Sequence, residues 1–152
     1  MKISTRGRYG LYAMLHLAIH EGQGPITAKD IADRQNVSVT YLEQLLSKLK
    51  KSGLVKGVRG PGGGYELTKP SSDIKIGEII RVLEGPMALV FCLPQSLSKK
   101  KCVKKDLCAC YPLWQRMTTE IDKILDSATL LDLKKDSLAL ERGQIKPVEN
   151  RF

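Results

Sequence analysis

The sequence predicts a mainly α-helical protein with one small β-hairpin, a winged helix-turn-helix followed by a long C-terminal helix. Two capped helices separated by a tight turn are expected between residues 28 and 52. Two strand-like runs follow, joined by a glycine-rich turn, as in a wing. An apolar stripe with helical period then runs from residue 113 to 131. We therefore divide the chain into four segments: 1–84, 85–111, 112–133 and 134–152.

The length and composition limit the classes to which this protein can belong. The chain has 152 residues, 42% of them hydrophobic, which is enough for a core. No apolar run approaches the ~20 residues that span a bilayer, and residues 1–6 lack the apolar segment of a signal peptide. We therefore expect a cytoplasmic protein with no membrane partner. The formal net charge of +9 favours a polyanionic partner such as nucleic acid, although a merely soluble basic protein has the same composition.

The first three helices are predicted from periodicity and caps. Residues 6–20 repeat apolar positions at three- and four-residue steps and end before Gly22. His16 and His20 lie on this helix; they are candidate metal ligands, but histidines on a helix are more often ordinary surface residues. Thr27 is placed to cap a short helix over residues 28–34, and Ser38 to cap a second over 39–52.

The outward face of the second capped helix carries the side-chain types that read base edges and hold phosphates. Because the apolar residues of this helix are expected to face the core, its polar residues are expected to face outward: Thr40, Tyr41, Glu43, Gln44, Ser47, Lys48 and Lys51. An ordinary solvated helix face has the same pattern, so this helix alone does not establish DNA binding.

The segment after this helix favours DNA binding. Residues 54–59 and 65–68 are strand-like, and Gly60-Pro61 and three further glycines lie between them. Arg59, at the base of this wing, is suited to a narrow minor groove. A phosphate-binding loop would need a helix and a Lys-Ser/Thr pair directly after the glycines, and Tyr65-Glu66 follows instead. With a short helix over residues 76–83, residues 1–84 form the predicted DNA-binding domain.

Residues 112–133 are predicted to form a dimerisation helix. Pro112 suits a first helical turn, and apolar residues follow at helical spacing: Leu113, Met117, Ile121, Ile124, Leu125, Ala128 and Leu131. Twenty helical residues extend about 30 Å, more than one small head covers. We therefore expect a two-fold homodimer; the alternative is a helix folded back on its own head. Residues 134–152 are expected to be a flexible tail.

All four cysteines lie between residues 92 and 110, as Cys92-x9-Cys102-x5-Cys108-x-Cys110. Paired Cys-x2-Cys knuckles, typical of a zinc ribbon, are absent from this spacing. Nearby lysines and the start of the following helix favour the thiolate form of these side chains. Spacing alone leaves three interpretations open: a metal or iron–sulfur cluster, a thiol redox switch, or inert cysteines.

Four segments resemble the IscR-type iron–sulfur cluster regulators and their winged-helix (Rrf-type) relatives: residues 1–10 (MKISTRGRYG), 41–49 (YLEQLLSKL), 53–55 (GLV) and 58–65 (VRGPGGGY). The resemblance implies a dimeric repressor or activator, not an enzyme, that binds a pseudo-palindromic DNA operator and controls cluster-biogenesis genes. It also implies a bound iron–sulfur cluster, [2Fe–2S] by preference and [4Fe–4S] as the alternative, and so a cluster-binding loop at residues 85–111.

By motif, Cys92, Cys102 and Cys108 match the family's ligand cysteines. We predict these DNA-contacting residues: Ser38, Val39, Thr40, Tyr41, Glu43, Gln44, Lys48, Arg59, Gly60 and Pro61. Glu43 matches the position at which cluster-bound and cluster-free forms of IscR differ in site preference.

The chain also departs from the family's pattern. The gap between the first two cysteines is longer, and Tyr111 stands where the family has a histidine ligand. The fourth ligand is therefore open between Cys110, Tyr111, a residue of a partner chain and a small-molecule thiol; we select Cys110 because a thiolate suits iron better than a phenol. Arg8 stands where the nitric-oxide-sensing branch has an acidic residue, which favours the IscR branch. The alternatives are a thiol-switch or partner-controlled regulator of the same family and, from another class, an iron–sulfur electron carrier.

Overall fold

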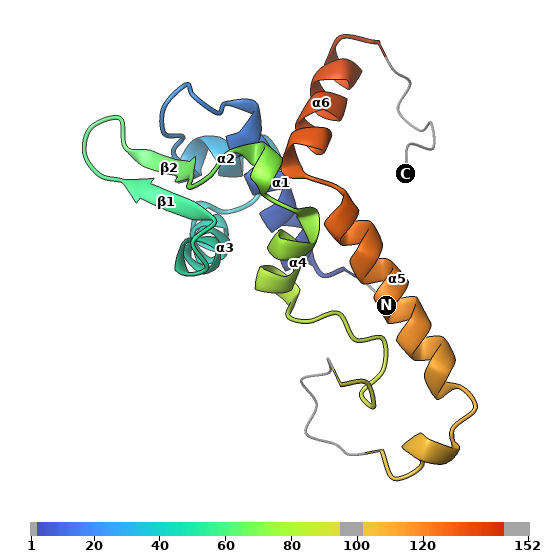
Figure 1. Ribbon diagram of the computed structural model, residues 1–152. Coiled ribbons are helices and arrows are strands. Elements are labelled where there is room, and N and C mark those ends of the chain that lie inside the picture. Colours follow the sequence, from blue (N-terminus) through green and yellow to red (C-terminus); the bar gives the residue numbers. More distant parts are fainter. Residues whose placement is uncertain (1–2, 95–101, 145–152) are drawn as a thin grey trace.

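The computed structural model describes residues 3–94 and 102–144, and it confirms the predicted fold class (Figure 1). A helical head carries a two-stranded hairpin on one side, and one long helix extends away from the head on another. The elements follow in this order: α1 (Thr5–Ile19), α2 (Ala28–Gln35), α3 (Val39–Lys51), β1 (Val55–Val58), β2 (Gly64–Leu67), α4 (Ile76–Glu84), α5 (Tyr111–Ser127) and α6 (Leu130–Glu141). None of the helices in the described parts combines the length and hydropathy needed to cross a bilayer.

Both caps predicted for the helix-turn-helix are present. The Thr27 hydroxyl accepts a hydrogen bond from the backbone N–H of Asp30 at 3.1 Å and starts α2. Asn36, with φ of 52°, ends α2 in the left-handed conformation and turns the chain toward α3. The Ser38 hydroxyl accepts from the N–H of Tyr41 at 3.2 Å and starts α3. These local hydrogen bonds set where the two helices begin and how tightly the turn joins them.

The wing is an antiparallel hairpin in which Val55 pairs with Leu67 and Val58 with Gly64. Two backbone hydrogen bonds join Tyr65 of β2 to Ile26, at 2.8 and 3.0 Å. They tie the hairpin to the segment between α1 and α2, so the wing has a defined orientation relative to the helix-turn-helix.

The core lies between α1, α3 and α4, and it contains the apolar faces predicted from periodicity. Leu130, the first residue of α6, is also fully buried there. Burying such a side chain stabilises the fold by roughly 1.5–3 kcal/mol relative to leaving it in water. The fully buried large side chains are Met14, Ile31, Leu42, Leu45, Leu46, Leu49, Leu54, Val55, Ile74, Ile79, Ile80 and Leu130.

The C-terminal part differs from the prediction. The expected single helix over 112–133 is two helices, because the backbone becomes extended at Ala128 and α6 begins after Thr129. Thr129 and Asp132 form a reciprocal capping box, which starts a helix in a new direction. The expected flexible tail from residue 134 is also wrong up to Glu141, since those residues belong to α6. Residues 145–152 of that tail lie outside the described part of the chain.

The apolar stripe of α5 divides between two environments. Leu125 and Ala128 pack against the core of the same chain. Leu113, Met117 and Ile124 remain exposed, at 53%, 41% and 60%. The C-terminal part of the helix therefore lies on its own head, and Leu113, Met117 and Ile124 are uncovered in the single chain.

Candidate DNA-binding face and cysteine loop

The exposed face of α3 forms a shallow groove. It is lined by Thr40, Glu43, Gln44, Ser47, Lys48 and Lys51. Leu42, Leu45, Leu46 and Leu49 are buried on the opposite face and fix the orientation of the helix. Hydroxyl, amide, carboxylate and ammonium groups thus lie side by side on one surface, as required for contacts to base edges and phosphates.

Two of the predicted DNA-contacting residues are half-buried in the structure. Val39 and Tyr41 pack against the core, and the Tyr41 ring stacks edge-on against Tyr9 of α1, with 6.2 Å between centroids. The Tyr41 hydroxyl is buried, and within the described residues it has no hydrogen-bond partner. Tyr41 therefore supports α3 from behind, whereas Ser38, Thr40, Glu43, Gln44 and Lys48 are exposed.

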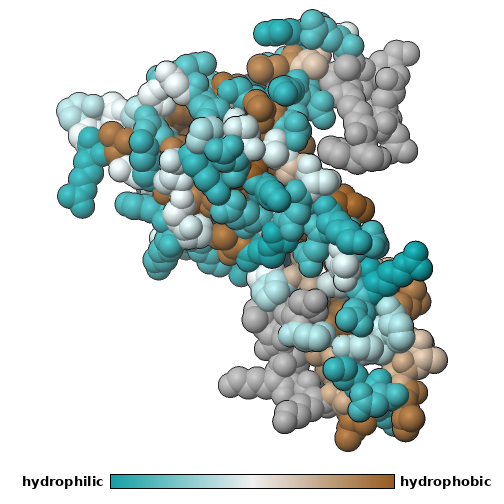
Figure 2. Space-filling view, viewed as in Figure 1, coloured by the Kyte–Doolittle hydropathy of each residue, from teal (hydrophilic) through white to brown (hydrophobic). Residues whose placement is uncertain are grey.

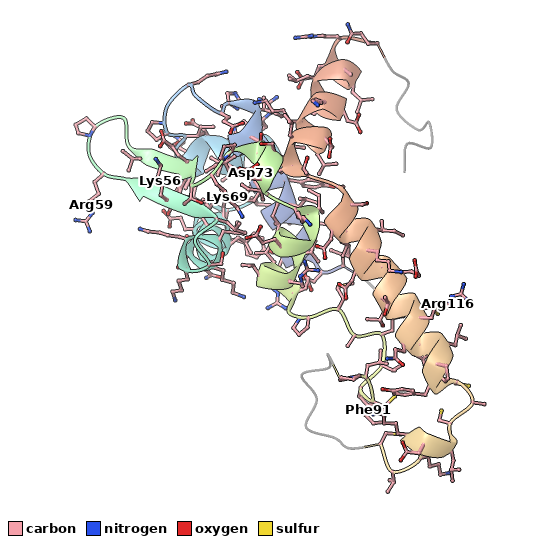
Figure 3. All side chains as sticks on the ribbon, viewed as in Figure 1. Lys56, Arg59, Lys69, Asp73, Phe91 and Arg116 are labelled. Atoms are coloured by element: carbon pink, nitrogen blue, oxygen red, sulfur yellow. The ribbon has the colours of Figure 1, made fainter. Side chains whose placement is uncertain are left out.

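The tip of the wing is exposed at Arg59, Gly60 and Pro61. Figure 3 shows Arg59 projecting away from the body of the protein. Gly60 has φ of 102°, and a Cβ at Gly63 would clash with the carbonyl oxygen of Val58. The tight turn therefore requires glycine at both positions, and the result is a narrow tip that holds a cation in solvent.

The cysteine loop lies at the end of α5 that is remote from the wing (Figure 1). Cys92 lies in a turn after α4, and Cys102, Cys108 and Cys110 precede α5. All four are free thiols; Cys110 is exposed and the other three are half-buried. The carbonyls of Cys108 and Cys110 accept from the N–H groups of Tyr111 at 3.1 Å and Trp114 at 3.2 Å, which joins this end of the loop to the helix.

The donor types in this loop suit iron, but they are not assembled into a site. Thiolates are the usual ligands of iron–sulfur clusters. Among the residues that the structure describes, no group of three His, Cys, Asp or Glu side chains is close enough to hold a metal ion. Residues 95–101, between Cys92 and Cys102, lie outside the described part. Binding a cluster would require this loop to bring its sulfur atoms together.

The two histidines of α1 form a stacked pair. Their ring centroids are 4.5 Å apart, and His20 Nδ1 lies 2.9 Å from the carbonyl oxygen of His16. Burial, with the neighbouring His20 and Arg34, lowers the pKa of His16, which keeps it neutral near pH 7. The expectation of ordinary surface histidines therefore holds for His20, which is half-buried, but not for His16, which is buried.

One polar constellation was not predicted from the sequence. The Arg81 guanidinium of α4 contacts Asp122 and Asp126 of α5 at 3.2 and 2.5 Å. The two aspartates are four residues apart, which indicates a shared helix face. The sequence does not identify Arg81 as the partner of these aspartates, because Arg81 lies 41 residues before Asp122.

Large apolar side chains are exposed on the cysteine loop and along α5. Leu113, Met117 and Ile124 are joined there by three side chains of the loop: Phe91, Val103 and Leu107. Figure 2 shows hydrophobic atoms near the end of the molecule that is remote from the wing. Exposed large apolar side chains in this number are typical of an interaction site.

The comparisons with known proteins agree with this geometry. Residues 3–136 match the Rrf2 family model, described as an iron-dependent transcriptional regulator. The HTH-type transcriptional regulator IscR of Vibrio atlanticus is 40% identical over 141 residues, 93% of this chain and 79% of that protein. The structure of T. potens IscR superposes with a TM-score of 0.71 at 42% identity, over 97% of this chain and 94% of that one.

A second regulator is equally similar in structure. CymR (YrzC), the global cysteine regulator of B. subtilis, superposes with a TM-score of 0.72 at 44% identity, over 89% of this chain and 97% of that one. An oxidized form of Staphylococcus aureus CymR gives a TM-score of 0.68 at 43% identity, over 88% and 96% of the two chains. Since the match to the Rrf2 model covers most of the sequence and the relatives are similar over most of their length, the chain belongs to the Rrf2 family of DNA-binding transcriptional regulators.

Proposed function

We propose that this protein is a homodimeric regulator that reads a pseudo-palindromic operator with α3 and the wing and senses iron–sulfur cluster status through the cysteine loop. The genes that it controls are those for cluster assembly. The observation that carries the proposal is the placement of free thiols on a loop that leads directly into α5, the helix that links this loop to the head. The IscR relatives support the same assignment.

In this proposal α3 enters the major groove and Arg59 of the wing enters the adjacent minor groove. The polar face of α3 contains Glu43 and Gln44 for base edges and Lys48 for phosphates. The rigid link between the wing and Ile26 fixes the offset between the two contacts. An electron carrier has no use for these features, which argues against that alternative class.

Replacing Arg59 by Ala should weaken binding to a verified operator by about 1–3 kcal/mol, because a charged contact to DNA is lost while the exposed wing keeps its fold. Fluorescence anisotropy with a labelled operator at fixed salt measures this effect. The matched control is Arg116→Ala, which removes an exposed arginine of α5 far from the wing (Figure 3). Equal affinities for wild type and Arg59→Ala would contradict the proposed role of the wing.

The proposed ligands are Cys92, Cys102 and Cys108, with Cys110 in the fourth position. Sulfur ligands of this kind hold [2Fe–2S] clusters, our preferred type, as well as [4Fe–4S] clusters. A bound cluster supplies a redox- and iron-sensitive crosslink between the chain after α4 and the start of α5. The protein contributes the thiolates and the N-terminus of α5, which follows directly after Cys110.

The exposed side chains of α5 support dimer formation. Leu113 and Met117 are four residues apart and Met117 and Ile124 seven, which is one and two helical turns, so all three exposed side chains lie along one face of the helix. A second copy of α5 would cover this face and place two heads on one side of a symmetric pair.

Purification under anaerobic conditions tests the cluster directly. We expect coloured protein with broad visible absorption and stoichiometric iron and acid-labile sulfide. A thiol switch is the second candidate, favoured by the similarity to CymR and its oxidized form. Colourless protein that takes up no iron and sulfide on reconstitution, but changes its DNA affinity on thiol oxidation, would replace our proposal with that candidate.

A further inference from the structure

Besides the apolar packing of Leu125 and Ala128 against the core, two sets of polar contacts attach helix α5 to the head. The first is a backbone bridge at its C-terminal end: the N–H of Ile76 donates to the carbonyl of Ala128 at 3.0 Å, and the N–H of Leu130 donates to that of Ile74 at 2.8 Å. The second consists of Arg81, Asp122 and Asp126, which we name the α4–α5 clamp. One attachment leaves a helix free to pivot, whereas two fix its direction.

The clamp is a specific arrangement of three side chains. Nη1 of Arg81 donates to Oδ1 of Asp122 at 3.2 Å, and Nη2 donates to Oδ1 of Asp126 at 2.5 Å. All three side chains are about one-third exposed. The planar guanidinium addresses both carboxylates at once, a geometry that a lysine ammonium does not reproduce.

Gly77 makes room for the clamp on α4. A Cβ at this position would clash with Oδ1 of Asp126 and would lie 2.9 Å from both terminal nitrogens of Arg81. Gly77 is buried at the second position of α4, so the backbone of α4 and the Arg81 side chain together contact the Asp126 carboxylate.

The α4–α5 clamp is better placed to fix the direction of α5 relative to the head than to stabilise the folded protein. Partly exposed ion pairs add little to folding free energy because water and salt screen them. Asp122 lies six residues, or about 9 Å, from the backbone bridge at Ala128. A contact at this distance resists rotation of α5 about the bridge. A rotation of about 10° about the bridge alone would move the far end of the roughly 25 Å helix by about 4 Å.

We propose that the α4–α5 clamp is the specificity determinant for operator half-site spacing. If two chains pair through α5, the angle between α5 and each head sets the distance between the two recognition helices, and that distance must match the DNA repeat. The proposal therefore rests on the proposed α5-mediated dimer. Opening the clamp lets each head pivot, and the dimer then accepts half-sites at several separations.

The test uses full-length protein and three variants: Arg81→Lys, Asp126→Asn and Gly77→Ala. The first two weaken the clamp from opposite sides, and the third displaces Asp126 without changing any charge. Operators selected by the wild-type protein from random DNA are resynthesised with the spacer between half-sites changed by one or two base pairs. Affinities for each spacer are measured by anisotropy, and thermal melting checks that each variant is folded.

We expect wild type to bind the selected spacer preferentially and the three variants to lose this preference, so that their affinity ratios across spacers fall toward one. The matched control is Lys123→Ala, which removes an exposed ion pair with Glu120 on α5 itself and should leave the preference intact. Folded, dimeric variants with the wild-type spacing preference would overturn the clamp proposal alone. A wild-type protein that sediments as a monomer on its operator would overturn the α5 dimer, and the clamp proposal with it.

Discussion

Replacing Ile124 by Asp should convert the protein from a dimer to a monomer. Ile124 is 60% exposed in the single chain, so the substitution leaves the fold of the head unchanged. In the proposed dimer the same position is covered by the partner helix, and a buried unpaired carboxylate there costs about 3–5 kcal/mol. That free energy corresponds to at least a hundredfold weaker association. Sedimentation velocity over a range of concentrations measures the change.

The matched control is Thr119→Asp, which introduces the same charge on the other side of α5. Thr119 is exposed and its side chain bonds back to the carbonyl of Gln115. On a helix with 3.6 residues per turn, it faces away from Leu113, Met117 and Ile124. The control should stay dimeric. An Ile124→Asp protein that sediments as the wild type does would remove α5 as the interface, and the operator would then be bound by some other arrangement of heads.

Ala at any one of Cys92, Cys102 and Cys108 should abolish the visible absorption after anaerobic reconstitution. Each substitution removes one of the three ligands that the motif assigns, and the remaining thiolates do not complete the coordination of a cluster. The half-buried cysteines lie outside the core of the head, so folding and dimer formation should be retained. Absorption spectra with iron and sulfide analysis give the result for each variant.

Cys110 and Tyr111 provide the internal comparison for this experiment. Cys110→Ala should shift or destabilise the spectrum if its sulfur is the fourth ligand, and Tyr111→Phe should do so if the phenol is. Cys110 is the exposed thiol of the loop, so its replacement is structurally mild. A full-intensity spectrum in Cys92→Ala or Cys102→Ala would show that the ligand assignment is wrong.

The parts of the fold that were predictable from sequence are those set by local interactions. Thr27 and Ser38 determine the starts of α2 and α3 through hydrogen bonds to residues three positions away. The wing follows from glycines that a tight turn requires. The orientation of Tyr41 was not predictable in the same way, because its contact with Tyr9 joins residues 32 positions apart and draws the ring off the exposed face.

The break between α5 and α6 shows why the C-terminal part was mispredicted. The apolar stripe continues through Ala128 and Leu131, so periodicity alone favours one helix. Thr129 and Asp132 have capping-box spacing, a local signal that the stripe obscured. The bridge to Ile74 and Ile76 then holds the extended backbone at the break, and a pairing over this distance is not encoded in any short motif.

The sequence predicted which residue types make up the candidate site better than it predicted where those residues lie in space. Spacing and residue type identify the thiols and the polar face of α3. They do not bring Cys92 close to Cys102, because ligand assembly depends on the conformation of the loop between them. Neither do they reveal Arg81, whose acidic partners belong to a helix that packs on α4 only in the folded chain.

The most direct test of the central claim compares cluster-bound and cluster-free protein on the same panel of DNA sites under anaerobic conditions. Both forms are prepared from one batch, and affinities are measured for operators selected separately with each form. We predict that the cluster changes affinity strongly at one set of sites and weakly at another, because it couples the loop to α5 and α5 to the heads. Equal affinities of the two forms at every site would contradict the claim that the cysteine loop is a sensor.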